Sequence, residues 1–131
     1  MKKKISLGVN IDHAATLRQL RGSTTSYPDL LDLTDIIRKA GGKQITIHLR
    51  EDRRHIQDAD VVLLAKKSKL PINLEMAVSE EMLKIALINK PSWVCFVPEK
   101  RQELTTEGGL NIIKVFAEIK KMTEILQKKI L

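Results

Sequence analysis

Short runs of β-branched and apolar residues are separated along the chain by longer stretches with helical periodicity. The short runs predict strands at Ile5–Ile11, Gln44–Leu49, Ile72–Met76 and Trp93–Val97. The stretches between and after them predict helices at Leu30–Ala40, Asp58–Ser68, Glu80–Asn89 and Asn111–Ile130. Ser79 is a predicted N-cap, and Gly41-Gly42 is a stop signal for the first helix. The alternation of strands and helices predicts a parallel α/β sheet.

The polar residues of the predicted strands share one face. Because side chains alternate across a strand, that face collects Asn10, Asp12, Thr46, His48, Arg50, Asn73 and Glu75. The opposite face carries Val9, Ile11, Ile45, Ile47, Ile72, Leu74 and Met76. A doubly wound parallel sheet is normally apolar on both faces. Polar groups near the carboxyl ends of the strands favour instead the mouth of a (β/α) barrel, where active sites lie.

Composition narrows the class of protein. The chain of 131 residues, 43% of them hydrophobic, is large enough for one domain. Its one cysteine, Cys95, excludes an internal disulfide framework and fits a reducing cytosol. No stretch reaches the roughly 18 apolar residues of a membrane span. Much of the net charge of +7 lies near the termini without an aromatic cluster. We therefore expect a cytoplasmic protein that binds neither membrane nor nucleic acid.

The chemically reactive residues gather in two charged segments. All three histidines lie within Val9–His13 or His48–His55, and each segment begins in or follows a predicted strand. Lysines outnumber arginines 16 to 7, yet six arginines lie in or beside the strand-end segments: Arg18, Arg21, Arg50, Arg53, Arg54 and Arg101. Histidine transfers protons near neutral pH, and arginine binds phosphate or carboxylate through two N–H groups. The pattern predicts an enzyme that acts on anionic substrates.

Each candidate also has a structural interpretation. Glu75 is either a general base or one partner of a structural ion pair. His48 is either a proton-transfer group or a hydrogen-bonded core histidine, and His55 can belong to the cap of the following helix. Asp12-His13 is a possible metal pair, but no third ligand stands at a recognisable spacing.

Three further features have mainly structural interpretations. The charged run Glu51–Arg54 is by itself typical of a solvated surface. Cys95 lies in an apolar run and is predicted to be inert core. The segment Thr105–Gly109 either holds a phosphate or a substrate hydroxyl at the start of the last helix, or is a plain capping loop.

Several long segments of the sequence are distinctive in order and composition. They are Gly-Val-Asn-Ile-Asp-His with Ala-Thr-Leu-Arg, Ile-His-Leu-Arg-Glu-Asp-Arg-Arg-His-Ile, Asn-Leu-Glu-Met-Ala, and Val-Pro-Glu-Lys-Arg with Thr-Thr-Glu-Gly-Gly-Leu. Together they resemble the pyridoxine 5'-phosphate synthase family. The resemblance extends from about Leu7 to Leu110, and residues 111–131 diverge. It implies one partial domain over residues 1–131, of the (β/α)8 TIM-barrel class.

The resemblance also implies an activity and roles for single residues. Family members condense 1-deoxy-D-xylulose 5-phosphate with 3-amino-2-oxopropyl phosphate, releasing phosphate and water, without a metal or an organic cofactor. His48 and Glu75 would be acid/base groups. Asn10 and Arg21 would contact the amino-ketone phosphate. The residues that would contact the deoxyxylulose phosphate are Asp12, His13, Arg50, His55 and Thr105.

The chain is much shorter than the family it resembles. Members are about twice as long, as a complete barrel requires. Their second-half strands, their other catalytic histidine and their glycine-rich phosphate-binding segments have no counterpart in this sequence. We therefore expect the N-terminal half of such an enzyme, incompetent alone and dependent on self-association or a complementary half; whole members assemble as octamers. A non-catalytic half-barrel that binds sugar phosphates or a partner chain is the alternative.

Overall fold

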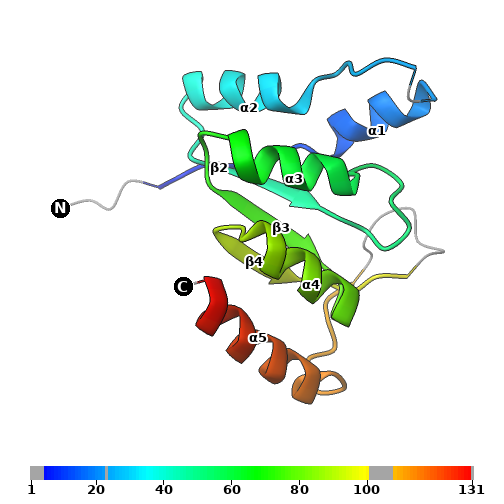
Figure 1. Cartoon of the computed structure of the whole chain (residues 1–131), viewed down its shortest axis with the longest axis vertical. Helices are drawn as coiled ribbons and strands as arrows, with labels where there is room; N and C mark the ends of the chain where they lie inside the picture. Colours follow the sequence, from blue (N-terminus) through cyan, green and yellow to red (C-terminus); the bar gives the residue numbers. More distant parts are fainter. Residues whose placement is uncertain (1–4, 23, 101–107, 131) are drawn as a thin grey trace.

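The structure, a computed structural model, describes residues 5–22, 24–100 and 108–130 (Figure 1). In chain order the elements are β1 (Gly8–Asn10), α1 (Asp12–Leu20), α2 (Leu30–Lys39), β2 (Gln44–His48), α3 (Asp58–Lys67), β3 (Ile72–Met76), α4 (Glu80–Asn89), β4 (Trp93–Phe96) and α5 (Phe116–Ile130). Strands and helices alternate from α2 onward. The predicted α/β organisation is confirmed.

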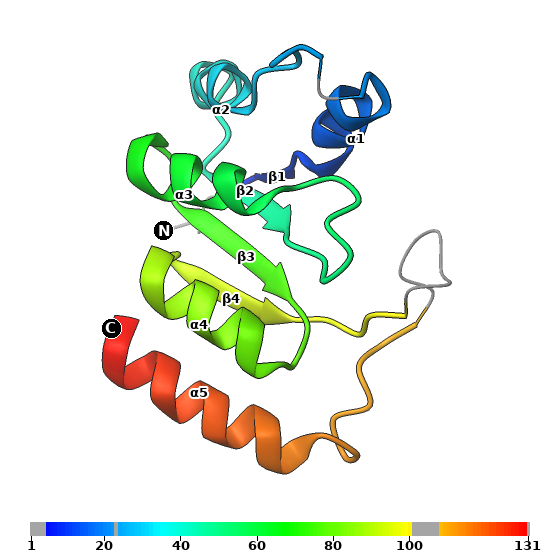
Figure 2. The same cartoon turned by 45° about the vertical axis from the view of Figure 1, so that its right-hand side comes forward.

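The four strands form one parallel sheet in the order β1–β2–β3–β4. The register places His48 beside Glu75, and Glu75 beside Cys95. Paired residues of neighbouring parallel strands point to the same face, so these side chains form one row across the sheet. The arrowheads of β2, β3 and β4 all point toward one end of the molecule (Figure 2). The carboxyl ends of the strands are therefore neighbours.

The apolar core lies between the sheet and the helices that cover one of its faces (Figure 2). Ile45, Ile47 and Leu74 are at most 1% exposed and belong to the same core cluster as Leu64 of α3 and Met82 of α4. Apolar burial is the main favourable term in folding and holds the two layers together. The predicted division of the strands into an apolar and a polar face is confirmed.

Both edges of the sheet are open in the described part of the chain. β1 is paired only with β2, and β4 only with β3. Trp93 at the β4 edge is 52% exposed. A barrel has no free edge, because each strand is paired on both sides. The architecture is therefore an α/β half-barrel.

Helix α1 is an element that the sequence pattern did not predict. Only Asp12 and Ala15 are buried among its nine residues, so it lacks a continuous apolar stripe. Its N-cap, Ile11, supplies no side-chain hydrogen bond. The helix begins directly after β1, and this arrangement places Asp12 at the carboxyl end of that strand.

Two predicted elements differ from the structure by more than one residue at an end. β1 spans Gly8–Asn10 rather than Ile5–Ile11, and Ile5, at 99% exposure, has no layer to pack against. The last helix begins at Phe116 rather than Asn111, because the Asn111 side chain accepts a hydrogen bond from the Lys114 backbone N–H and closes a turn. No helix within the described ranges is long and apolar enough to cross a membrane.

Local sequence signals explain why the start of α4 and the end of α2 lie close to their predicted positions. The Ser79 side chain accepts a hydrogen bond from the Met82 backbone N–H and caps α4 as expected. After α2, Gly41 has φ +100°, a conformation that favours glycine. At Gly42 a Cβ atom would collide with the side chain of Ile37. The glycine pair is thus required both by backbone conformation and by close packing.

A buried ion pair connects α1 to α3. The guanidinium of Arg18 donates two hydrogen bonds to the Asp60 carboxylate, at 2.8 and 2.7 Å. Both side chains are at most 13% exposed. Asp60 also accepts from the Gln57 backbone N–H at the start of α3. Sequence reasoning considered Arg18 for anion binding, but its anionic partner is part of the fold.

Breaking the Arg18–Asp60 ion pair is expected to lower the stability of the fold. Asp60→Asn leaves a buried guanidinium without its counter-charge, so we expect the free energy of unfolding to fall by about 3–5 kcal/mol. Urea unfolding followed by circular dichroism measures the change. The double variant Arg18→Met/Asp60→Leu, which removes both charges, is the control and should lose much less stability. A loss below about 1 kcal/mol in Asp60→Asn would contradict a structural role.

Candidate active site

Three ionisable side chains converge at the carboxyl ends of the first three strands. Asp12 follows β1, His48 ends β2 and Glu75 lies near the end of β3. One side-chain ligand atom from each of the three lies within 4.8 Å of the others. Asp12 and His48 are buried, and Glu75 is half-buried. The expected convergence of these residues on one face of the sheet is thus observed.

Asp12 is held in place by both of its carboxylate oxygens. Oδ1 accepts a hydrogen bond of 2.8 Å from the His48 backbone N–H, and Oδ2 accepts one of 2.8 Å from the Asn10 side-chain amide. The Asn10 side-chain oxygen in turn accepts from the Asp12 backbone N–H at 2.9 Å. Asn10 and Asp12 are therefore a locked pair that also joins β1 to the end of β2.

Glu75 is in an environment that favours its protonated form. Burial raises the pKa of Glu75, His48 lowers it in part, and the nearby carboxylate of Asp12 raises it further. No ion pair involves Glu75 among the described residues, so the structural ion pair considered as its alternative is not observed. A carboxyl group with a raised pKa can both accept and return a proton closer to neutral pH.

The ring of His48 is hydrogen-bonded to Glu99, a residue that the sequence analysis did not assign to the site. His48 Nε2 lies 2.8 Å from Glu99 Oε1. The second oxygen of Glu99 accepts a hydrogen bond of 3.0 Å from the Glu51 backbone N–H. Glu99 follows β4 and lies in the Val-Pro-Glu-Lys segment, so the strand-end rule that selected Asp12 and His48 would have found it as well.

His55 lies beside His48, and its ring centroid is 6.1 Å away. Its Nδ1 accepts a hydrogen bond of 2.8 Å from the Ile56 backbone N–H, so Nε2 carries the proton in the neutral ring. Burial lowers the pKa of His55, an effect that Asp12 opposes and that His48 and Arg50 strengthen. His55 is thus suited to donate a hydrogen bond as a neutral ring.

The lowered pKa of His55 predicts a pH-dependent stability. Below about pH 6.5 the unfolded chain binds a proton at this position more readily than the folded chain does. The free energy of unfolding should therefore fall as the pH is lowered through this value, and rise as the pH is raised. Urea unfolding at about pH 5.5 and about pH 7.5 measures the slope. His55→Asn should reduce it, and an unchanged slope in that variant would contradict this assignment.

Several arginines expected to bind anions are paired with carboxylates of this chain. Arg50 donates to both Asp52 oxygens at 3.1 Å, and to the Lys100 carbonyl at 3.4 Å. Arg54 donates to the same Asp52 carboxylate. Although burial alone would raise the pKa of Asp52, the hydrogen bonds from Arg50 and Arg54 lower it well below its usual range. The run Glu51–Arg54 is therefore an ordered loop rather than only a solvated surface.

The remaining candidates are less directly connected to this cluster. His13 lies on α1 and Arg21 is the C-cap of that helix; both are exposed. Within the described ranges, no hydrogen bond or ion pair connects either residue to the cluster of Asp12, His48 and Glu75. Thr105 and Arg101 lie outside the described residues.

Cys95 is exposed, so the prediction of a core cysteine is wrong. The reason is that β4 is an edge strand and Cys95 lies on the face without helices.

The cluster of Asp12, His48 and Glu75 has the residue types of a metal site. Both Asp12 oxygens and His48 Nε2 also have hydrogen-bond partners within the protein. The absence of a metal in the function stays a prediction.

Strand ends that present carboxylates and histidines on the polar face of a half-barrel define a TIM-barrel type of enzyme site. The sequence model of the family described as pyridoxal phosphate biosynthesis protein PdxJ matches residues 7–131. The chain belongs to this family. The match includes residues 111–131, beyond the segments that carried the resemblance.

Curated relatives agree with this assignment. A pyridoxine 5'-phosphate synthase of Bdellovibrio bacteriovorus is 59% identical over 128 residues, which are 98% of this chain and 53% of the relative. Those of Pseudoalteromonas translucida and Aliivibrio fischeri are 56% and 58% identical over 124 residues, which cover 95% and 92% of this chain. The chain spans about half the length of the curated relatives it matches.

Proposed function

We propose that this chain supplies the N-terminal half of a pyridoxine 5'-phosphate synthase. The whole enzyme would condense 1-deoxy-D-xylulose 5-phosphate with 3-amino-2-oxopropyl phosphate, closing the pyridine ring and releasing phosphate and water. The observation that carries the proposal is the convergence of Asp12, His48 and Glu75 at neighbouring strand ends. Carbonyl condensation and dehydration require repeated proton transfers, which such a cluster can perform. The names of the curated relatives support the same reaction.

Two residues would carry the proton transfers. Glu75, with its raised pKa, is suited to take a proton from a carbon or nitrogen of the substrate and to return it to a leaving hydroxyl. His48, which stands beside Glu75 across the β2–β3 pair, would act on the same substrate as a second acid/base group. The fixed Asp12 carboxylate would orient the hydroxyl groups of the sugar phosphate.

Other side chains would bind the two phosphorylated substrates. Asn10 and Arg21 would contact the amino-ketone phosphate, and the exposed side chain of Arg21 is open to an incoming ligand. The contacts to the deoxyxylulose phosphate would come from Asp12, His13, Arg50, His55 and Thr105. His55 would donate through Nε2, which the hydrogen bond at Nδ1 leaves protonated.

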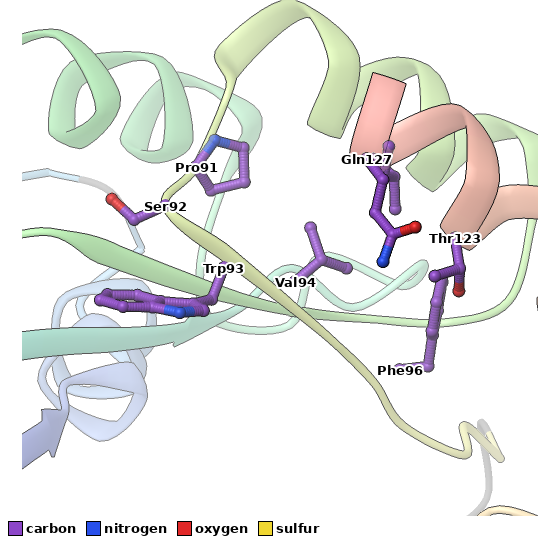
Figure 3. Close-up of a pocket in the computed structure, with 8 residues that line it drawn as sticks. Pro91, Ser92, Trp93, Val94, Phe96, Thr123 and Gln127 are labelled. Atoms are coloured by element: carbon purple, nitrogen blue, oxygen red, sulfur yellow. The ribbon is translucent and has the colours of Figure 1, made fainter. Parts of the chain in front are cut away.

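We further propose a cytoplasmic enzyme in which a complementary half, or another copy of the chain, closes the barrel at β1 and β4. A groove of about 300 Å³ lies between β4 and α5 (Figure 3), and none of the three residues of the ionisable cluster lines it. Its walls include Val94 and Phe96 from β4, and Thr123 and Gln127 from α5. An unpaired strand beside an apolar groove is the place where a further parallel strand with its side chains would pack.

The decisive test is turnover with and without the missing half. The purified chain is mixed with a separately expressed C-terminal half of the Bdellovibrio bacteriovorus relative, and formation of pyridoxine 5'-phosphate from the two substrates is followed. We expect turnover by the mixture and little or none by the chain alone. Substantial turnover by the chain alone would contradict the proposed incompleteness.

The same experiment distinguishes the enzyme from the alternative function, a non-catalytic half-barrel that binds a sugar phosphate. A half-barrel module without catalytic activity would bind a sugar phosphate, and calorimetric titration of the mixture with 1-deoxy-D-xylulose 5-phosphate detects such binding. Binding without turnover in the mixture, although the two halves co-sediment, would favour the module over the enzyme.

A further inference from the structure

Glu99 is a carboxylate beside the ionisable cluster that is held through both of its oxygens. Its Oε1 lies 2.8 Å from the ring Nε2 of His48, and its Oε2 accepts a hydrogen bond of 3.0 Å from the backbone N–H of Glu51. The side chains of Glu99 and His48 are only 5% and 8% exposed. A buried carboxylate with both oxygens bonded has a fixed orientation, and it fixes the ring to which it is bonded.

The protonation of this pair follows from chemistry. Burial acts to raise the pKa of Glu99, but hydrogen bonds from His48 and from the Glu51 backbone N–H lower it below its ordinary value. Glu99 is therefore an ionised acceptor at neutral pH. An ionised carboxylate cannot donate, so Nε2 of His48 must carry the proton in this hydrogen bond. In the neutral ring, Nδ1 then holds the free lone pair.

We propose that Glu99 is a positioning residue that makes Nδ1 of His48 the atom that exchanges protons with the substrate. The inference rests on the proposed function and deepens it. A proton leaves the substrate for the Nδ1 lone pair, while Nε2 keeps its own proton and its bond to Glu99. The positive charge that develops on the ring is balanced by the Glu99 carboxylate. When Nδ1 later returns the proton, the ring is neutral again and Glu99 has not changed its protonation state.

The other charged groups around His48 do not offer this contact. Asp12 accepts from the backbone N–H of His48 rather than from its ring. Glu75 lies across from it on β3 and acts on it through charge. His55 and Arg50 lie in the loop after β2. His55 places a polar ring beside His48, and Arg50 contributes a positive charge. Within the described ranges, Glu99 is the residue whose side chain accepts a hydrogen bond from the His48 ring.

Nitrogen-15 NMR of the chain labelled at histidine tests the proposal without any substrate. In the neutral form of the ring, we expect a His48 Nε2–H proton that exchanges slowly with solvent and a Nδ1 without a proton. Glu99→Ala should abolish the slow exchange, and Glu99→Gln should restore it, because the amide oxygen still accepts. Glu118→Ala, an exposed carboxylate on α5, is the control. A neutral wild-type ring whose proton is on Nδ1, or an Nε2–H signal unchanged in Glu99→Ala, would overturn the proposal.

Kinetics of the assembled enzyme provide a second readout. We expect Glu99→Ala to lower kcat by about 10–100-fold with little change in KM, and Glu99→Gln to lose activity although it keeps the ring in place, because it lacks the balancing charge. Wild-type kcat in Glu99→Ala would overturn the positioning role. If the assembly has no turnover in any variant, including the wild type, the proposed function fails, and the NMR result alone decides whether Glu99 positions His48.

Discussion

Removal of either acid/base group is expected to lower kcat of the assembled enzyme by about 10²–10⁴-fold. The two variants are His48→Ala, which removes the ring at the end of β2, and Glu75→Gln, which keeps the shape of the side chain but cannot take a proton. Both positions are on the face of the sheet without helices, so the apolar core is not changed. The measurement is steady-state formation of pyridoxine 5'-phosphate by each variant mixed with the complementary half.

A matched control separates catalysis from folding. Asp35→Asn makes the same kind of carboxylate-to-amide change on α2, where Asp35 is paired only with Arg38 at the surface. This variant should have wild-type kcat, and circular dichroism should show all three variants folded. Wild-type turnover in His48→Ala or in Glu75→Gln would rule out the proposed role of that residue.

The second large effect is expected in the assembly of the chain. Among the residues that the structure describes, β1 and β4 each lack a neighbouring strand on one side. The isolated chain should therefore self-associate, and sedimentation should give a mass of at least two copies. Trp93→Lys places a charge on the exposed edge strand and should shift the chain to the monomer. A charge at an edge must lose water when another strand pairs there, which disfavours association.

The control for association is an equally exposed apolar residue away from the sheet edges. Ile36 on α2 is 61% exposed, compared with 52% for Trp93, so Ile36→Lys adds the same charge at a similar exposure. Ile36→Lys should leave the sedimentation behaviour unchanged. A wild-type chain that is a stable monomer would refute the association, and equal effects of the two variants would show that the β4 edge is not the contact.

The sequence specified most of the architecture because its signals were local. The spacing of apolar residues in Gln44–Leu49 and Ile72–Met76 predicted strands with one apolar and one polar face. The structure has strands at Gln44–His48 and Ile72–Met76. Ser79 marked the start of α4 through a hydrogen bond that spans three residues. Alternation across strands also predicted that His48 and Glu75 share a face, because the period of a strand is two residues in any tertiary context.

Other features depended on contacts between segments that are far apart in the sequence. Helix α1 has only two buried residues, and Arg18 on it is bonded to Asp60, 42 residues later. A segment stabilised by such a long-range contact need not carry an apolar stripe of its own. Cys95 was expected to be buried because its neighbours in sequence are apolar. It is exposed, because in the described part of the chain β4 has no strand on its outer side.

The sequence by itself determined which residues have suitable chemistry and on which face of the sheet they lie. The tertiary structure decided how their hydrogen-bonding capacity is used. Arg50 and Arg54 have the chemistry of phosphate ligands, and the fold pairs both of them with Asp52. Glu99 was part of a recognised segment without an assigned role, and the fold brings it to the His48 ring across 51 residues. The physical reason is that residue type fixes what a group can donate or accept, whereas its actual partner depends on which strand ends the sheet brings together.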